Sequence, residues 1–570
     1  MRILVRRSLV LATLCALLLG IVGAAAGPTA LAAPPPTNTR VAGINIDTTT
    51  IPQLEALMNA HRLNSVQLVE FYLHRIAALN PKLHAVITVS RTALADARTA
   101  EAARRRGDRR PLLGIPVIVK DNIDTTGMPT TAGSWALAGS TPPDAFIIRQ
   151  LKAAGAIIIA KANLSEWANF RSGPSSSGWS GIGGQTNMAY VRDRNPCGSS
   201  SGSGVAASAD LATVAVGTET DGSIVCPSGA NADAGIKPTL GLWSRTGIVP
   251  ISADQDTAGP IARNMTDAAV LLGAGIGVDP ADGATAAQSG KAFSDYTRFL
   301  DKNALRGARI GVWREGTVFP PGTPTPEVDA IMATTIATLE AQGATIVDPA
   351  NIDLGAANDT EFPALLCEFK SDIASYLAAN TAAGYPKTLQ DLIDFNDAHK
   401  ALEEDPWNNA VFELAQETNG RDADCAALRA VATPTAQAAI DDLMAADNLD
   451  AIIAPTNSPA WVTDPVNGDD LSIFVGSSGP GAVAGYPDIT VPAGFVGHLP
   501  VGVSFMGGRW SEPELIGLAY AFEQASHVRV PPTFLASEST PAATRGPATH
   551  GEQRAIVPSR NGGWRMPGVR

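Results

Sequence analysis

The segment from Asn195 to Pro227 constrains the fold of this 570-residue chain more than any other. It opens on a run of glycine and serine, becomes small and apolar from Val205 to Val216, and returns to glycine and serine at Gly222-Ser223. Flexible Gly/Ser linkers do not continue into apolar runs of this kind, which are typical of a buried helix or strand. The two serine sites are therefore predicted to be joined by about one buried element.

Both serine sites have the composition of a nucleophile beside an oxyanion-binding backbone. Glycine permits positive φ and leaves neighbouring N–H groups uncovered, as a site that holds a developing negative charge requires. A serine next to such N–H groups is a candidate nucleophile.

One interpretation of the first site is the nucleophile elbow of α/β-hydrolases, because Gly198-Ser199-Ser200-Ser201-Gly202 fits the pattern G-x-S-x-G. That fold needs a histidine later in the chain, and four histidines follow: His399, His498, His527 and His550. None of them has a sequence setting that is typical of a catalytic base, and His498 has the surroundings of a turn residue. An esterase of this type, with Ser200 as nucleophile, is kept as an alternative.

A lysine is the other base to consider, and Lys120 stands out. It ends the apolar, β-branched run Ile115-Pro116-Val117-Ile118-Val119, which predicts a buried strand. Burial lowers the pKa of a lysine and favours the neutral amine, which can accept a proton. A strand-end lysine that reaches solvent or pairs with Asp121 is the alternative.

Taken in order, these segments resemble the amidase signature family. The matching pieces run from Ile51 to Pro532 and comprise Lys120 after its strand, Gly198-Ser199-Ser200, Ser223-Ile224, Gly235 to Arg245, and Asp256 to Pro260. The segments Thr218 to Ser223, Ala484 to Pro487 and Trp510 to Pro513 are most similar to the bacterial peptide amidase branch.

The resemblance implies a Ser-Ser-Lys triad. Ser223 would be the nucleophile, Ser199, in a cis peptide bond, would relay the proton, and Lys120 would be the base. The backbone N–H groups of Thr220, Asp221, Gly222 and Ser223 would form the oxyanion hole. The substrate would be a carboxylic amide, with C-terminal peptide amides as one candidate, and the products would be the acid and ammonia. Esters of the same acyl group should react too, because the acyl-enzyme is shared.

The family resemblance also implies the fold, an α/β domain with a mixed central sheet that helices cover on both faces, expected over residues 33–536. The chain departs from the commoner family pattern at four positions. Cys197 and Ser201 stand where glycine is usual, Glu219 where aspartate is usual, and Asp221 where glycine is usual. The triad positions are unchanged, so these departures bear on packing, substrate choice and the oxyanion hole.

Residues 1–32 have the layout of a signal peptide. Arg2, Arg6 and Arg7 precede the apolar run Leu9 to Ala26, and Ala30-Leu31-Ala32 offers a cleavage site. A secreted, cell-envelope or periplasmic protein is expected, and an uncleaved membrane anchor is the alternative. Residues 537–570 are rich in Pro, Gly, Ser and Arg and are predicted to be a disordered tail.

Composition and charge argue against nucleic-acid-binding and metal-dependent functions. The chain is 45% hydrophobic and 17% charged, and its formal net charge of −13 gives it no reason to bind nucleic acid. No His, Cys or carboxylate cluster has the spacing of metal ligands, so neither a metal nor an organic cofactor is expected. The expected partner is a small-molecule or peptide amide, and a membrane only if the N-terminal segment is uncleaved. A non-catalytic exported binding protein on the same fold is a further alternative.

Cys197 and Cys226 lie two and three residues from Ser199 and Ser223, so a real triad would bring them close together. A disulfide and a pair of packed free thiols both fit the sequence.

The remaining pattern predicts the elements around the site. Helices are expected in 51–80 (two), 93–106, 327–342 and 512–525, and strands at 156–160, 307–313, 344–347, 451–454, 489–491 and 500–506. The basic end of the helix at 93–106, with Arg104, is expected to be solvated, as is Glu368, and Pro492 is expected to end its strand. Asn169 and Arg171 are predicted either to contact substrate or to lie on a surface loop.

Overall fold

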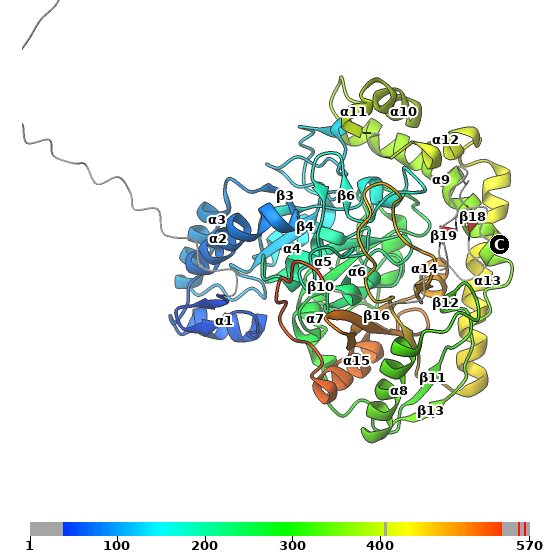
Figure 1. The fold of residues 1–570 in the computed structure, drawn as a ribbon. Helices are drawn as coiled ribbons and strands as arrows, with labels where there is room; N and C mark the ends of the chain where they lie inside the picture. Colours follow the sequence, from blue (N-terminus) through cyan, green and yellow to red (C-terminus); the bar gives the residue numbers. More distant parts are fainter. Residues whose placement is uncertain (1–37, 404–406, 539–556, 559–563, 566–570) are drawn as a thin grey trace, which may run out of the picture. The chain divides into compact units, whose positions relative to one another are not determined.

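The computed structural model describes residues 38–403, 407–538, 557–558 and 564–565 (Figure 1). The predicted signal peptide lies outside them, as does most of the predicted tail. Two short tail strands, β18 (Val557–Pro558) and β19 (Trp564–Arg565), pair antiparallel. Within the described ranges, no helix combines the length and the apolar character needed to span a bilayer.

In the described part of the chain, eleven strands form one mixed sheet (Figure 1). Listed as neighbours across the sheet, they are β13 (Thr345–Val347), β11 (Arg309–Val312), β14 (Ala451–Pro455), β17 (Leu499–Met506), β16 (Asp488–Val496), β9 (Ala234–Lys237), β10 (Thr257–Ala262), β8 (Val214–Glu219), β4 (Pro116–Lys120), β5 (Ile157–Ala162) and β3 (Val86–Val89). Every residue of β4, β5, β8 and β10 is buried, which requires cover on both faces. The predicted α/β class with a mixed sheet is confirmed.

Two groups of helices pack on this sheet. In the first, α5 (Ser201–Ser208) and α6 (Val225–Ala230) contact each other and the central strands. In the second, α15 (Glu512–Ser526) contacts α7 (Met265–Ala274) and α8 (Pro326–Ala341). The other helices are α1 (Ile51–Asn59), α2 (Ser65–Leu83), α3 (Ala93–Arg105), α4 (Phe146–Ala153), α9 (Ala357–Asn380), α10 (Leu389–Ala398), α11 (Lys400–Glu403), α12 (Ala410–Glu417), α13 (Ala423–Asp447) and α14 (Gly479–Ala484). The predicted helices are thereby confirmed, with boundaries within a few residues.

Local signals account for where these helices begin. Asn64 precedes α2 and accepts the Gln67 backbone N–H at 2.9 Å, while the Gln67 side chain accepts the Asn64 N–H at 3.1 Å, so the two form a capping box. Pro513 stands in the first turn of α15, where its missing N–H costs no helical hydrogen bond.

The prediction that Pro492 ends its strand is wrong. Strand β16 continues to Val496, and Pro492 lies opposite Gly502 of β17 with a register shift directly after it. Pairing of β16 with β9 stops at Thr490, so Pro492 lies beyond the part of the strand that is paired on both sides. A bulge at a singly paired position tolerates the missing proline N–H.

Two charged side chains predicted to be solvated are buried instead. Arg104 is 2% exposed and donates to Glu55 and Asn59, each at 2.7 Å, and to the Leu113 carbonyl. Glu368 is 1% exposed and is paired with Arg429. In both cases a partner distant in the sequence compensates the buried charge, and the local helical pattern does not reveal such a partner.

Candidate active site

Lys120 ends strand β4, an interior strand of the sheet that pairs with the parallel strands β5 and β8. Its side chain is fully buried, and Nζ donates to Ser199 Oγ at 2.7 Å, to Thr218 Oγ1 at 2.9 Å and to the Thr218 carbonyl at 3.2 Å. The strand-end lysine thus binds the first serine segment. It neither reaches solvent nor pairs with Asp121. Asp121 instead pairs with a different lysine, Lys161, at 3.2 Å.

The surroundings of Lys120 favour its neutral amine. Burial lowers the pKa of Lys120 to about 7, and the carboxylates of Asp256 and Glu219 oppose that shift. A neutral amine keeps two N–H groups and gains one lone pair. The two Thr218 acceptors can take both N–H groups, which leaves the lone pair for the Ser199 hydroxyl proton.

Ser199 follows the cis peptide bond Gly198–Ser199, the geometry that the family resemblance implies. Its side chain is fully buried, and its carbonyl accepts the N–H of Ser165 at 3.0 Å. The next residue, Ser200, donates its backbone N–H to the carbonyl of Ser223 at 3.2 Å. The two serine segments, separated in the sequence by α5 and β8, are therefore held against each other.

Ser223 lies in the turn between β8 and α6 and is 8% exposed. Glu219, the last residue of β8, folds back over this turn, and its Oε2 accepts the N–H groups of Ile224 at 2.7 Å and Val225 at 3.0 Å. Gly222 has φ +75°, and a Cβ there would lie 3.0 Å from Ser478 Oγ. The turn thus needs glycine directly before the candidate nucleophile.

Asp221, in the same turn, accepts a hydrogen bond from the Ser478 hydroxyl at its Oδ1. Both side chains are partly exposed, whereas Lys120 and Ser199 are not. Removal from water and the nearby charge of Glu361 raise the pKa of Asp221 well above its usual range. The aspartate at this position thus ties the turn to the N-terminus of α14.

Two further buried residues bind this turn, and the sequence assigned a role to neither. Asp256 Oδ1 accepts the Thr220 hydroxyl at 2.6 Å, and Gln255 Nε2 donates to the Thr220 carbonyl at 3.0 Å. Asp256 opens Asp256-Thr257-Ala258-Gly259-Pro260, a segment that matches the family, and Gln255 directly precedes it, so this match was the signal that could have indicated them.

The described residues contain two disulfides. Cys197 and Cys226 are bonded, with Cα atoms 6.0 Å apart, so they are not free thiols. The bond links the residue before Gly198-Ser199 to the helix after Ser223. Cys367 of α9 and Cys425 of α13 form the second disulfide.

Replacing Cys197 and Cys226 together by alanine is expected to lower the free energy of unfolding by about 3.6 kcal/mol in the chain-entropy model. The expectation follows from the sequence separation of 29 residues that the bond closes. Urea unfolding followed by tryptophan fluorescence measures the change, with the Cys367→Ala/Cys425→Ala variant as the matched comparison. An unchanged unfolding midpoint, together with thiols in the parent that react with a maleimide, would contradict the bond.

The two predicted substrate contacts behave differently. Arg171 is 2% exposed and pairs with Glu166 at 3.1 Å, so it belongs to the interior and not to a surface loop. Asn169 is partly buried and donates to the Ser177 hydroxyl at 3.0 Å. Among the described residues, neither side chain forms an observed hydrogen bond to Lys120, Ser199 or Ser223.

The hydrolase alternative lacks its base in the described residues. Ser200 is fully buried, and its hydroxyl donates to the Thr218 carbonyl at 3.0 Å and accepts the Thr218 N–H at 3.2 Å. His498 is exposed and pairs with Glu538 at 3.1 Å, and His399 and His527 are exposed as well. His550 lies outside the described residues.

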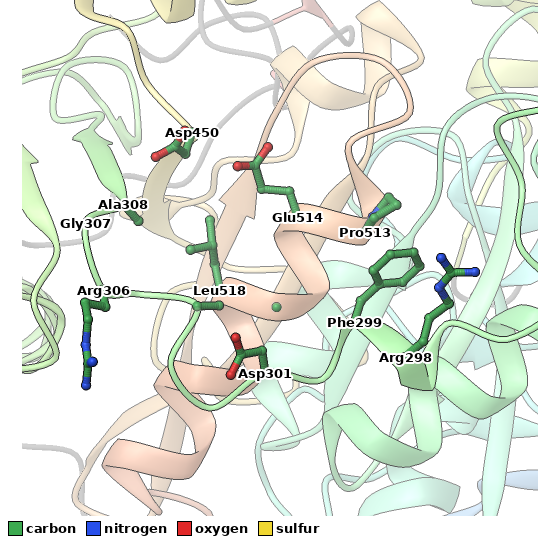
Figure 2. A pocket seen from close by; sticks show the side chains of 12 residues that line it. Arg298, Phe299, Asp301, Arg306, Gly307, Ala308, Asp450, Pro513, Glu514 and Leu518 are labelled. Carbon is green, nitrogen blue, oxygen red and sulfur yellow. The ribbon is translucent and has the colours of Figure 1, made fainter.

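A cavity of about 440 Å³ lies elsewhere, between the start of α15 and the segment leading into β11 (Figure 2). Figure 2 labels Asp301, Asp450 and Glu514 among the residues that line it, together with Arg298 and Arg306. Its lining contains neither serine nor lysine and includes no residue of the serine segments.

The comparisons with known proteins agree with this geometry. The Amidase family model matches residues 67–516. A probable amidase of Arabidopsis thaliana is 39% identical over 508 residues, which cover 86% of this chain and 93% of that protein. The structure of native peptide amidase from Stenotrophomonas maltophilia is 45% identical with a TM-score of 0.81, and the match covers 85% of this chain and 99% of that one.

A peptide amidase solved with the competitive inhibitor chymostatin is 46% identical, with a TM-score of 0.82 and the same coverage. The family model spans well over half of the chain, and both structures match nearly all of their own length. The chain therefore belongs to the amidase signature family, as an amide-hydrolysing enzyme that is similar to the bacterial peptide amidases.

Proposed function

We propose that this enzyme hydrolyses primary carboxamides, C-terminal peptide amides among them, with Ser223 as nucleophile, Ser199 as proton relay and Lys120 as base. One observation carries the proposal. The buried Lys120 amine, whose pKa lies near neutrality, is 2.7 Å from the Ser199 hydroxyl, and the Ser199–Ser200 segment is bonded to the backbone of Ser223. The identity of 45–46% to peptide amidases supports the substrate class.

The proposed chemistry begins with one coupled proton transfer. Neutral Lys120 takes the Ser199 proton while Ser199 takes the Ser223 proton, and Ser223 Oγ attacks the amide carbon. The carbonyl π electrons become an oxyanion, which the N–H groups of residues 220–223 would stabilise. The proton returns through Ser199 to the amide nitrogen, the C–N bond breaks, and ammonia leaves. Water then attacks the acyl-enzyme by the same relay, which releases the acid and restores Ser223.

Ammonia release from a matched substrate set tests this function. We expect an N-acylated dipeptide amide to yield ammonia and the free acid by mass spectrometry, and the methyl ester of the same peptide to yield the same acid. Cleavage of the ester alone would favour an esterase. Inertness of a folded protein toward both would favour a binding protein.

The pH dependence of kcat/KM is expected to show an acidic limb with an apparent pKa of about 7, because Lys120 accepts a proton only when neutral. Activity should therefore be low below this pH and rise through it. Asp256→Asn should move the limb to lower pH, since the Asp256 carboxylate raises the Lys120 pKa. A limb that stays in place in this variant would point to another group as the base.

We also propose that the enzyme is exported by way of residues 1–32. The two disulfides support export, because such bonds persist in oxidising compartments. Expression of the full chain with a C-terminal tag, followed by intact-mass analysis of the secreted protein, is expected to show cleavage after Ala32. Retention of the whole chain in the cell would contradict it.

A further inference from the structure

Gln255 is completely buried, and its side-chain amide is fully occupied. Nε2 donates to the Thr220 carbonyl at 3.0 Å and to Glu361 Oε1 at 2.6 Å, while Oε1 accepts Arg429 Nη1 at 2.8 Å. Because both amide protons and the carbonyl oxygen are engaged, the amide has one orientation only.

The bond to the Thr220 carbonyl has a directional consequence. The Thr220–Asp221 peptide is trans, so its C=O and N–H point to opposite sides of the chain. Gln255 holds the C=O and thereby sets the direction of the Asp221 N–H. Asp256 accepts a hydrogen bond from the Thr220 hydroxyl at 2.6 Å, so Thr220 cannot rotate without breaking two hydrogen bonds.

Gln255 is itself held by an ion pair between two long helices. Arg429 of α13 binds Glu368 of α9 through Nε at 2.8 Å and Nη2 at 2.6 Å, and Glu368 Oε2 also accepts the Ser252 hydroxyl at 2.6 Å. Such two-point pairing fixes the guanidinium plane. The Arg429 nitrogen that reaches Gln255 is part of that plane.

The second disulfide lies beside this ion pair. Cys367 immediately precedes Glu368, and Cys425 lies one helical turn before Arg429. Helices α9 and α13, which pack against each other (Figure 1), are thus covalently joined where they carry the pair.

We propose that Gln255 is a positioning residue for the oxyanion hole: it aims the Asp221 N–H by holding the Thr220 carbonyl, and the Glu368–Arg429 pair and the Cys367–Cys425 disulfide hold it in place. This inference rests on the proposed function, in which the oxyanion lies at residues 220–223. The proposal gives α9 and α13, which lie between β11 and β14 in the sequence, a role in the chemical step in addition to any contact with substrate.

Gln255→Met tests the link, because methionine has a similar length and volume and cannot donate to the Thr220 carbonyl. Removing one oxyanion donor lowers kcat by about 100- to 1,000-fold, and misaiming one should cost less, so we expect a fall of about 10- to 100-fold with KM within about threefold. Gln288→Met is the matched control. Gln288 is also buried and donates to two carbonyls, those of Gly241 and Gly277, and this variant should keep kcat within about twofold.

A second readout separates positioning from general damage. A peptide aldehyde forms a hemiacetal with Ser223 whose oxyanion occupies the hole, whereas the product acid binds without forming it. In Gln255→Met the aldehyde affinity should fall in parallel with kcat, while the affinity for the acid stays within about threefold. An unchanged kcat, or equal losses of aldehyde and acid affinity, would overturn the proposal.

The proposed function fails in a different way. A parent enzyme that releases no ammonia, or that is labelled at a serine other than Ser223, would refute the triad before Gln255 is tested. If Gln255→Met does not fold, Glu368→Gln probes the same link one step away. It keeps an acceptor for Ser252 and Arg429, and we expect kcat to fall about three- to tenfold with the same split between aldehyde and acid. Equal losses of aldehyde and acid affinity in Glu368→Gln would likewise overturn the proposal.

Discussion

Ser223→Ala is expected to lower kcat/KM for a peptide amide by about 10⁴-fold or more, because removal of a serine nucleophile abolishes the acyl-enzyme route. Ser223 lies in the turn that Glu219, Gln255 and Asp256 hold by hydrogen bonds. Alanine fits this turn without steric conflict, so the protein should fold normally. Intact mass after treatment with a fluorophosphonate should show one adduct on the parent and none on Ser223→Ala.

Ser200→Ala is the matched control for this experiment. Ser200 is a buried neighbour whose hydroxyl bonds only to the backbone of Thr218 in the hydrogen bonds given for it, so its loss should reduce activity only about two- to fivefold. An adduct that persists in Ser223→Ala and disappears in Ser200→Ala would exclude the proposed triad and identify Ser200 as the nucleophile.

Lys120→Met should lower kcat by about 10³-fold, the range typical of a lost general base. Methionine fills the volume of the lysine stem and introduces no charge, so stability should change little. The rate of fluorophosphonate labelling should fall in the same proportion. It should also lose its dependence on pH around 7, where the pKa of Lys120 lies in the parent.

Lys237→Met provides the comparison for removing a buried lysine elsewhere. Lys237 ends strand β9, and its Nζ donates to the carbonyls of Gly481 and Tyr486 and not to a serine. Labelling of this variant should keep the pH dependence of the parent. A Lys120→Met enzyme that keeps its acidic limb would show that another group supplies the base.

The parts of the site that the sequence predicted are those with local signatures. Lys120 ends an apolar run, and the serines are flanked by glycine, so each can be recognised within ten residues. The structure confirms the α/β fold and brings Lys120 to Ser199, while the catalytic roles of the three residues stay predictions.

The supporting contacts could not be predicted in this way. Gln255 meets Thr220 across 35 residues, and Arg429 meets Glu368 across 61. Such contacts form only through tertiary packing, such as that of α9 against α13. Glu368 illustrates the resulting error, because a charge on a helix of no clear amphipathic pattern is expected in water unless its distant partner is known.

The burial of Lys120 also bears on how the enzyme can be attached to a support. An amine with a pKa near 7 is largely unprotonated at slightly alkaline pH. If Lys120 were exposed to solvent, it would therefore be the first lysine to react with an amine-directed coupling reagent. Lys120 has no exposed surface, whereas Lys82, Lys291, Lys302 and Lys400 are exposed. Coupling through lysines should therefore consume these surface amines and leave the proposed base intact.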